Sequence, residues 1–238
     1  MIRAAMQSTI DLAIASANFR YSGIQLNRRM RLLQVLGRNN SINVRKVLWT
    51  CAALNLPFEN EPWGVPPMLL ADPQFLNLNP NALVPVLKDR DFVLWESNSI
   101  IRYLANKYNG AHLYPAEAQA RAEVDRWIDW QATELNQAWM YTFMALVRNS
   151  PAHADGEALR KSQDSWTKQM RIIEQQITRT GAYIAGGQFS LADIPVALSV
   201  NRWFSTPFKR VDLPAVAAYF ERLQPVAGFT SYCANGMP

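Results

Sequence analysis

The arrangement of apolar and polar positions changes about halfway along the chain. Residues 31–36, RLLQVL, form a short apolar run that ends at a glycine, which is typical of a buried parallel strand. The next segment repeats apolar residues at intervals of three and four as far as Leu54, which predicts a helix that begins near Ser41 or Asn40. From Ala116 onward the helical repeat dominates. The pattern therefore predicts an α/β domain followed by an all-α domain.

The rest of the first domain is expected to contain a β-hairpin and a second helix. Residues 62–73 are rich in proline and predict an irregular loop. Residues 84–87 and 92–95 are apolar and flank the polar tetrapeptide 88–91, whose length suits a hairpin. An amphipathic helix is expected over 97–108, because its apolar positions recur with helical spacing. With the first strand and helix, these elements complete the predicted α/β unit.

Long helical repeats occupy residues 116–147 and 156–180, with no convincing strand pattern between them. The segment FSLADI that follows predicts the start of another helix. Ser190 is expected to accept a hydrogen bond from the backbone N–H of Asp193, while the Asp193 carboxylate reaches back, and Phe189 and Ile194 would form the hydrophobic staple. We interpret this motif as a folding signal and assign it no chemistry.

Composition and charge exclude two classes of protein. Apolar residues make up 49% of the 238 residues, which is enough for a sizeable core. No window approaches the roughly 18 to 20 consecutive apolar residues of a membrane-spanning helix, so we expect no membrane span. The formal net charge is +5, but residues 1–29 hold four arginines and one aspartate, which leaves +2 for the remaining chain. Without a basic run interleaved with aromatic residues, a nucleic-acid partner is not expected.

Residues 1–29 are expected to form an extension outside the fold, which would begin at Met30. The weak apolar stretch 10–17 is short, contains an acidic residue and is a poor match to a secretion signal. Cys51 and Cys233 lie far apart without a CxxC spacing, which argues against a metal site or a disulfide framework. We therefore expect a cytoplasmic protein without a metal.

Two neighbouring features suggest a site for a zwitterionic, peptide-like ligand. Pro85 interrupts an apolar, strand-like run, and because proline cannot donate a ladder hydrogen bond, the edge near Val84 is left open. Glu96 and Ser97 stand where a strand passes into a helix, whose free N–H groups attract an anion while the carboxylate can hold a cation. The alternative interpretation makes Ser97 a plain N-cap and Pro85 part of an edge-strand turn.

Several segments in this order resemble the glutathione transferase superfamily, within its bacterial, cytosolic, serine-type branch of theta-, nu- or beta-like members. They are GRNNSINVRKVLW (37–49), NPNALVPVL (79–87), ESNSIIRYL (96–104) and FSLADI (189–194). The resemblance covers residues 30 to about 225. It implies an N-terminal thioredoxin-like domain with a mixed four-stranded sheet and helices (30–109), a linker (110–117) and an all-helical C-terminal bundle (118–238).

The resemblance also assigns the activation of the glutathione thiol. Ser41, in the pattern S-x-x-x-R/K, matches the catalytic serine of serine-type members, at the positive end of the first helix. Asn43 ranks second for this role and Asn40 third. The alternative is that Ser41 is a plain N-cap. Cys51 falls beyond the site on the apolar face of the helix, so we expect it to pack in the core.

The remaining glutathione contacts are implied in the same way. Val84, before a Pro85 that the family holds in cis, would pair through its backbone with the cysteinyl part of glutathione. Glu96 would hold the ligand's ammonium group and Ser97 its γ-glutamyl carboxylate. Leu83 replaces a polar or basic residue of some relatives, and Arg90 stands where the family usually has glycine, which leaves the turn type open.

The predicted function is that of a glutathione transferase, in which the thiolate attacks an electrophile or reduces a peroxide or disulfide. A binding or regulatory protein without turnover is the alternative, and a glutathione-dependent isomerase or dehalogenase is a third option. The resemblance implies a homodimer that takes glutathione as co-substrate and a small hydrophobic electrophile. The electrophile pocket would lie in the second domain, which has an aromatic and Met-rich stretch that is more typical of core: Trp139, Met140, Tyr141, Phe143 and Met144.

Overall fold

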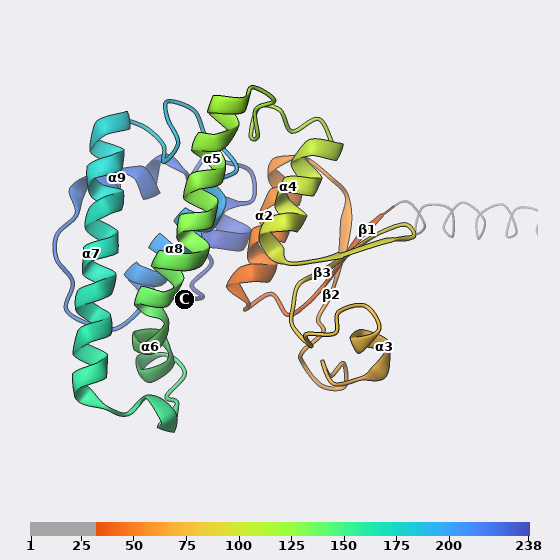
Figure 1. Cartoon of the computed structure of the whole chain (residues 1–238), viewed down its shortest axis with the longest axis horizontal. Helices are drawn as coiled ribbons and strands as arrows, with labels where there is room; N and C mark the ends of the chain where they lie inside the picture. Colours follow the sequence, from red (N-terminus) through yellow and green to blue (C-terminus); the bar gives the residue numbers. More distant parts are fainter. Residues whose placement is uncertain (1–31) are drawn as a thin grey trace, which may run out of the picture.

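The computed structural model describes residues 32–238, and the interpretation of residues 1–29 lies outside this part of the chain. The first half alternates strands and helices, as expected, and lies on the right of Figure 1. Its elements are β1 (Leu33–Leu36), α2 (Ile42–Ala53), β2 (Phe58–Glu61), α3 (Pro73–Leu76), β3 (Val86–Asp89), β4 (Phe92–Trp95) and α4 (Ser97–Lys107).

The strands form a mixed four-stranded sheet in the order β2-β1-β3-β4, which confirms the predicted fold class. β1 pairs with β2 in parallel and with β3 antiparallel, and β3 pairs with β4 antiparallel. β2 had no strand signal of its own, because its sequence FENE lacks an apolar run. The side chain of Asn60 fixes its position by donating hydrogen bonds to the carbonyls of Val35 and Gly37, both at 2.9 Å.

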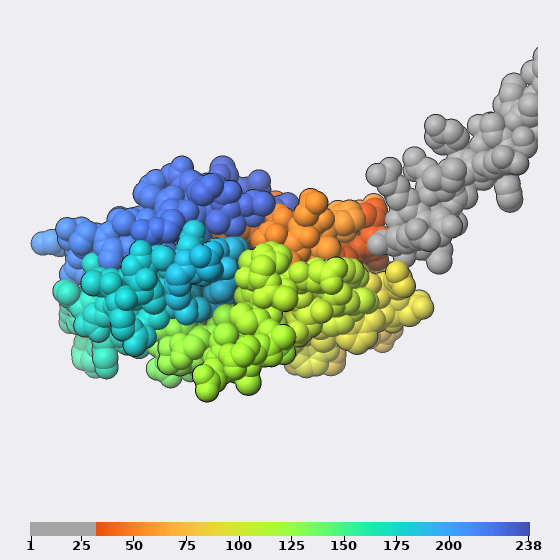
Figure 2. Space-filling view, turned by 90° about the horizontal axis from the view of Figure 1, so that it is seen from above, coloured from red at the N-terminus to blue at the C-terminus, as the bar shows by residue number. Residues whose placement is uncertain are grey.

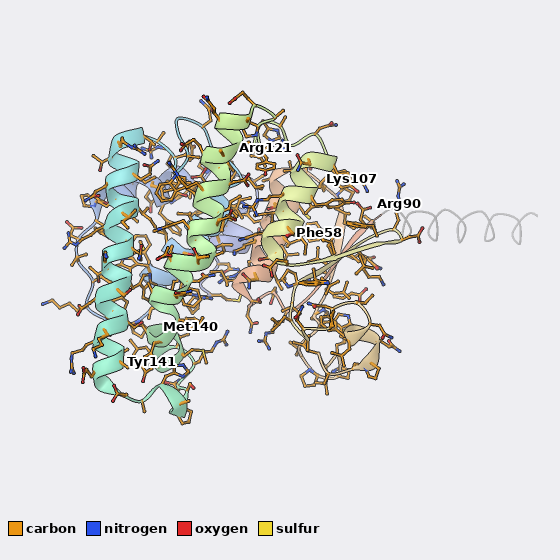
Figure 3. The ribbon with its side chains drawn as sticks, viewed as in Figure 1. Phe58, Arg90, Lys107, Arg121, Met140 and Tyr141 are labelled. Carbon is orange, nitrogen blue, oxygen red and sulfur yellow. The ribbon has the colours of Figure 1, made fainter. Side chains whose placement is uncertain are left out.

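The β3–β4 hairpin is tighter than the sequence suggested. Its pairing continues into the polar tetrapeptide, where Asp89 faces Phe92, so only Arg90 and Asp91 form the loop. Arg90 has a φ of 59°, in the left-handed region that glycine adopts most readily. Its side chain points away from the tip of the hairpin (Figure 3). The missing glycine therefore leaves strain in the turn without disturbing the strand pairing.

The second half is helical, on the left of Figure 1, and confirms the predicted all-α domain. The expected stretch 116–147 consists of two α-helices joined without a break by one π-helical turn, η1. α7, the longest of the described helices, packs along α6. The elements are α5 (Ala118–Trp130), η1 (Gln131–Leu135), α6 (Asn136–Leu146), η2 (Pro151–His153), α7 (Gly156–Thr180), α8 (Asp193–Ser205), α9 (Pro214–Arg222) and η3 (Phe229–Cys233).

α2 belongs to the first half of the chain and packs against elements of both halves. Nine of its twelve residues are buried, and it packs against β1 and α4 on one side and against α8 and η3 on the other. The indole N–H of Trp49 donates to the carbonyl of Ala227 at 3.1 Å. The Arg45 guanidinium donates to the carbonyls of Met237 and Pro238, each at 2.9 Å. The end of the chain, in blue, thus lies against the orange segment that contains α2 (Figure 2).

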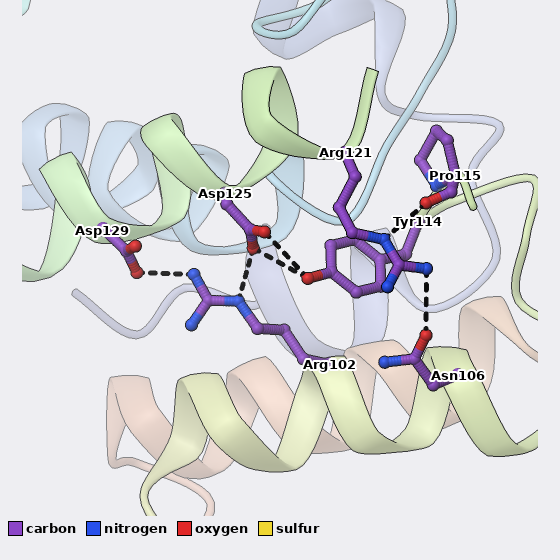
Figure 4. Close-up of polar contacts among 7 residues, drawn as sticks. All are labelled: Arg102, Asn106, Tyr114, Pro115, Arg121, Asp125 and Asp129. Carbon is purple, nitrogen blue, oxygen red and sulfur yellow. Dashed lines mark hydrogen bonds and ion pairs between the residues drawn. The ribbon is translucent and has the colours of Figure 1, made fainter. Parts of the chain in front are cut away.

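A polar network joins α4 to α5 and is drawn in Figure 4. Arg102 donates from Nε to Asp125 at 2.6 Å and from Nη2 to Asp129 at 2.5 Å. The hydroxyl of Tyr114 donates to the same Asp125 carboxylate, and the Arg121 guanidinium lies 4.4 Å from the Tyr114 ring centroid. Because Asp125 accepts from two side chains at once, the network fixes the helical domain against the helix that follows the sheet.

The start of α8 differs in detail from the expected capping box. The Asp193 carboxylate does reach back, accepting from the Ser190 N–H at 2.7 Å and from its hydroxyl at 2.9 Å. The Asp193 N–H, however, donates to the Ser190 carbonyl rather than to its hydroxyl. The carboxylate also accepts from the N–H of Ile184 and the hydroxyl of Tyr219, so it ties a loop and α9 to the helix start.

The helices of residues 32–238 include none with the length and apolar character needed to cross a bilayer.

Candidate functional site

A cleft of about 210 Å³ opens beside the sheet, between the start of α4, the segment before β3 and the first turn of α2. It brings together most of the residues singled out in the sequence, from three separate stretches of the chain. Ser41 is not among its lining residues. The cleft is lined by Asn43, Asn79, Asn81, Leu83, Val84, Pro85, Trp95, Glu96 and Ser97.

Val84 presents free backbone groups to this cleft. The Val84–Pro85 peptide bond is cis, and β3 begins one residue later. Within residues 32–238, neither the N–H nor the carbonyl of Val84 makes a hydrogen bond. An extended peptide could therefore pair with Val84 as an added strand, satisfying backbone groups that the fold leaves unpaired.

Asn79 is a site residue that the sequence reasoning missed. Its side chain is buried, donates to the Leu83 carbonyl at 2.8 Å and accepts from the N–H and side-chain amide of Asn81 at 3.0 Å. These bonds hold the segment that leads to Val84 in one conformation. The available signal was the motif NPN, because asparagine side chains bond backbone groups two residues ahead in Asx turns.

The start of α4 forms the second wall of the cleft. Glu96 has φ 75° and ψ 107°, an uncommon conformation for a residue with a side chain, and its carbonyl accepts from the N–H of Ile100 at 2.9 Å. No described side chain caps this helix start. The N–H groups of the first turn are therefore free to bind an anion, beside a buried Ser97 and an exposed Glu96 carboxylate.

Ser41 occupies the N-cap position of α2, but its hydroxyl does not cap the helix. The backbone of Ser41 is engaged, since its N–H donates to the Arg38 carbonyl and its carbonyl accepts from the Arg45 N–H. Among described residues the half-buried hydroxyl has no hydrogen-bond partner, so it can donate to a ligand at the positive end of the helix. Asn43 lines the cleft two positions further on, whereas Asn40 is exposed and does not.

The protein's own thiols are unsuited to nucleophilic chemistry. Cys51 is buried among apolar side chains, and burial raises its pKa to about 12. Burial also raises the pKa of the Cys233 thiol. Residues 32–238 contain no cluster of His, Cys, Asp and Glu that could hold a metal ion. Neither thiol is therefore available as a nucleophile at the cleft.

The aromatic stretch of α6 is mostly committed to packing. Trp139 and Phe143 are buried and hold the Arg202 guanidinium between them, 4.2 and 3.9 Å from the two ring centroids. The Tyr141 hydroxyl accepts from the N–H of Asp155 at 3.0 Å. Met140 is exposed, and Figure 3 shows it with Tyr141 on α6, away from the sheet. The buried positions of Trp139 and Phe143 thus agree with the interpretation that this stretch belongs mostly to the core and not to a substrate pocket.

The fold and cleft together define a thioredoxin-like domain with an open strand edge at Val84, fused to a helical domain. The family described as "Glutathione S-transferase, N-terminal domain" matches residues 40–107, and the family described as "Glutathione S-transferase, C-terminal domain" matches residues 135–224. Glutathione S-transferase GstB of Escherichia coli strain K12 is 33% identical over 194 residues, which cover 81% of this chain and 93% of GstB. The chain therefore belongs to the glutathione S-transferase family.

Similar proteins of the theta class support the same assignment. Glutathione S-transferase theta-2 of Rattus norvegicus is 32% identical over 169 residues, which cover 65% of each chain. The crystal structure of a theta class glutathione S-transferase from Xanthomonas axonopodis pv. citri, with glutathione bound, superposes with a TM-score of 0.79. It is 31% identical and covers 85% of this chain and 97% of that one. The predictions of a transferase enzyme with glutathione as co-substrate are confirmed.

Proposed function

We propose that the cleft binds glutathione across its two walls and that Ser41 activates the thiol. The γ-glutamyl carboxylate binds the free N–H groups at the start of α4 and the Ser97 hydroxyl, and Glu96 holds the ammonium group. The cysteinyl backbone pairs with Val84 as an added strand. The observation that carries this proposal is the presence in one cleft of an uncapped helix start and an unpaired strand edge.

The position of Ser41 suits the activation of a thiol. Its hydroxyl has no capping role, so it can donate a hydrogen bond to a thiolate while the N-terminal end of α2 supplies positive potential. Lowering a thiol pKa from about 8.5 to about 6.5 requires about 2.7 kcal/mol and makes most of the ligand anionic at pH 7. One charge-assisted hydrogen bond plus the helix dipole can supply that amount.

The reaction that follows is a nucleophilic transfer. The glutathione thiolate forms a carbon–sulfur bond with a small hydrophobic electrophile, and the leaving group departs with its electron pair. Reduction of an organic hydroperoxide or a disulfide would use the same thiolate. The glutathione domain of this proposal spans 30–109, and after the linker 110–117 the helical domain, 118–238, contributes the electrophile pocket.

A homodimer is part of the same proposal, because large apolar side chains are exposed in both halves of the molecule. Leu83, before β3, is 63% exposed, and Phe92 and Trp95, at the two ends of β4, are 46% and 41% exposed. Met140 is 50% exposed on α6. In a two-fold dimer the first group can cover the helical domain of the partner. Light scattering on wild type and Phe92→Glu tests this, and a monomeric wild type at micromolar concentration would contradict it.

The cytoplasm is the compartment that fits both described cysteines, which are free and buried. Detoxification of electrophiles is the physiological role that follows from the proposed reaction.

Calorimetry and turnover of matched variants test the binding mode. We expect Glu96→Gln to weaken glutathione binding by about tenfold, because a charge-assisted contact of this kind contributes about 1–2 kcal/mol. Asp91→Asn, an exposed acid outside the cleft, serves as the control. Unchanged affinity of Glu96→Gln would remove Glu96 from the site, whereas binding without turnover by the wild type would favour a purely binding protein.

A further inference from the structure

Lys46 connects the two helices whose first turns border the cleft. It lies on α2, three residues after Asn43 and therefore on a neighbouring part of the same helix face. Its ammonium group is buried and donates to the side-chain oxygen of Asn98 at 3.2 Å. Asn98 follows Ser97 in the first turn of α4. One buried hydrogen bond thus ties the candidate thiol-activating helix to the candidate γ-glutamyl site.

The ammonium group of Lys46 is poorly compensated within the described part of the chain. It has three N–H donors, one neutral acceptor in Asn98, and no carboxylate within ion-pair distance among residues 32–238. The charged groups that act on it are Glu96 beside the start of α4, Arg102 further along α4, and Arg202 on α8. Two of these three are cations, so only Glu96 favours the charged form.

This environment makes the protonation of Lys46 sensitive to an added anion. Burial lowers the pKa of Lys46 to about 7, and the Glu96 carboxylate opposes part of that effect. A carboxylate bound at the first turn of α4 would add a second negative charge on the side of Asn98. In a buried environment such a charge favours the ammonium form strongly, because little solvent screens it.

We propose that Lys46 is a positioning residue for glutathione, which orients the first turn of α4 through Asn98 and takes up a proton when the γ-glutamyl carboxylate binds there. The inference rests on the binding mode proposed above. The proton comes from solvent and is held on Nζ of Lys46, and no covalent bond forms or breaks. The role predicts a signature that a purely structural hydrogen bond would not give, namely proton uptake linked to ligand binding.

Calorimetry with S-methylglutathione measures this uptake directly. The methyl group removes the ionisable thiol, whose own proton release would otherwise mask the effect. Titrations at pH 7.5 in phosphate and in Tris, which differ in ionisation enthalpy, give the number of protons bound. We expect roughly half a proton for the wild type, because raising a pKa from about 7 to about 8 changes the protonated fraction by that amount at this pH.

Substitutions at Lys46 distinguish the effect of its positive charge from the effect of its ability to take up a proton. We expect Lys46→Met to abolish the uptake and to weaken binding about tenfold, since both the cation and the Asn98 bond are lost. Lys46→Arg keeps a permanent charge, so it should restore part of the affinity without restoring the uptake. Lys88→Met, on β3 and outside the cleft, should keep both. Circular dichroism and thermal melting establish that each variant is folded.

Asn98→Asp provides a second route that leaves Lys46 in place. A carboxylate at position 98 would keep Lys46 protonated before the ligand arrives, so the uptake should disappear. Proton uptake by folded Lys46→Met equal to that of the wild type would overturn the inference, as would unchanged affinity of that variant. If the wild-type protein binds neither glutathione nor S-methylglutathione, the proposed binding mode itself fails. Binding by the wild type without proton uptake would instead overturn only the inference about Lys46.

Discussion

Gly37 lies so close to Val84 that a Cβ atom at position 37 would stand 2.9 Å from the Cβ of Val84. The same atom would stand 2.5 Å from Cγ2 of Val44, and Gly37 has a φ of 147°. Gly37 also donates its N–H to the Glu61 carbonyl at the end of the sheet. The position of the open backbone edge at Val84 therefore depends on a glycine at position 37, directly after β1, because any side chain there would push Val84 away.

Replacing Gly37 by alanine should move Val84 and weaken the site. We expect Gly37→Ala to lower the free energy of unfolding by about 1–3 kcal/mol, because the new methyl group overpacks the space between Val44 and Val84. Urea denaturation measures the stability and calorimetry the affinity for glutathione, which should fall as well. Gly187→Ala is the control, since a Cβ there meets no atom within 4 Å. Wild-type affinity in Gly37→Ala would show that Val84 is not held in this way.

Removal of the Ser41 hydroxyl should affect turnover more than binding. We expect Ser41→Ala to lower kcat by about 10- to 100-fold, because one hydrogen bond to the thiolate is lost, while the dissociation constant of glutathione changes little. The pH at which conjugation reaches half of its maximal rate should rise, since the bound thiol regains a higher pKa. Ser99→Ala, an exposed serine of α4, is the control. Turnover equal to wild type would exclude Ser41 from the mechanism.

The buried carboxylate of Asp193 should be important for stability. It accepts four hydrogen bonds, from two N–H groups and two hydroxyls, and burial raises its pKa to about 6. We expect Asp193→Ala to lower the free energy of unfolding by about 3–5 kcal/mol, because buried N–H groups of Ile184 and Ser190 lose their partner. Thermal and urea denaturation measure the change. Asp164→Ala, exposed on α7, should stay within about 0.5 kcal/mol of the wild type.

Lys46 should make stability depend on pH. Between pH 7 and 10.5 the unfolded chain keeps the Lys46 proton while the folded protein has lost it, so the contribution of Lys46 to stability rises with pH across this window. Lys46→Met lacks this dependence. The free energy of unfolding of Lys46→Met minus that of the wild type should therefore be largest near pH 7. This difference should fall by roughly 3–5 kcal/mol towards pH 10, because the wild type gains stability over that range. Urea denaturation at several pH values measures the difference, and a constant difference would contradict the expectation.

Glycine at position 90 should relieve the hairpin turn. Arg90→Gly replaces a residue at φ 59° by one without a Cβ, so we expect the free energy of unfolding to rise by about 0.5–1 kcal/mol. Asp91→Gly, in the same loop without a positive φ, should not be stabilising. Chemical denaturation of both variants decides between relief of local strain and a general effect of glycine in the loop.

The elements that the sequence revealed are those encoded by local periodicity. α2, the β3–β4 hairpin and α4 carry their apolar patterns within a few residues, and the predicted helix start at Ser41 lies beside the first residue of α2. β2 could not be recognised in this way. It has no apolar run and becomes a strand because β1 offers a parallel partner along Phe58–Glu61.

The parts of the site that escaped prediction depend on contacts between distant positions. Lys46 and Asn98 are 52 residues apart in the chain, and only the packing of α2 on α4 joins them. The sequence placed Lys46 in the motif SINVRK without indicating that its ammonium group would be buried. Asn79, in contrast, acts on a carbonyl four residues away, so its motif held a local signal that could have been used.

The shared position of α2 has a consequence for the chemistry of the protein's own thiols. Cys51 on α2 and Cys233 in η3 come from opposite halves of the chain, yet both are sealed in the same apolar core. A thiol reagent can reach either sulfur only when that core opens. The rate at which each cysteine is labelled therefore reports how often the core around it opens. Equal rates for the two cysteines would show that α2 and η3 open as a single cooperative unit.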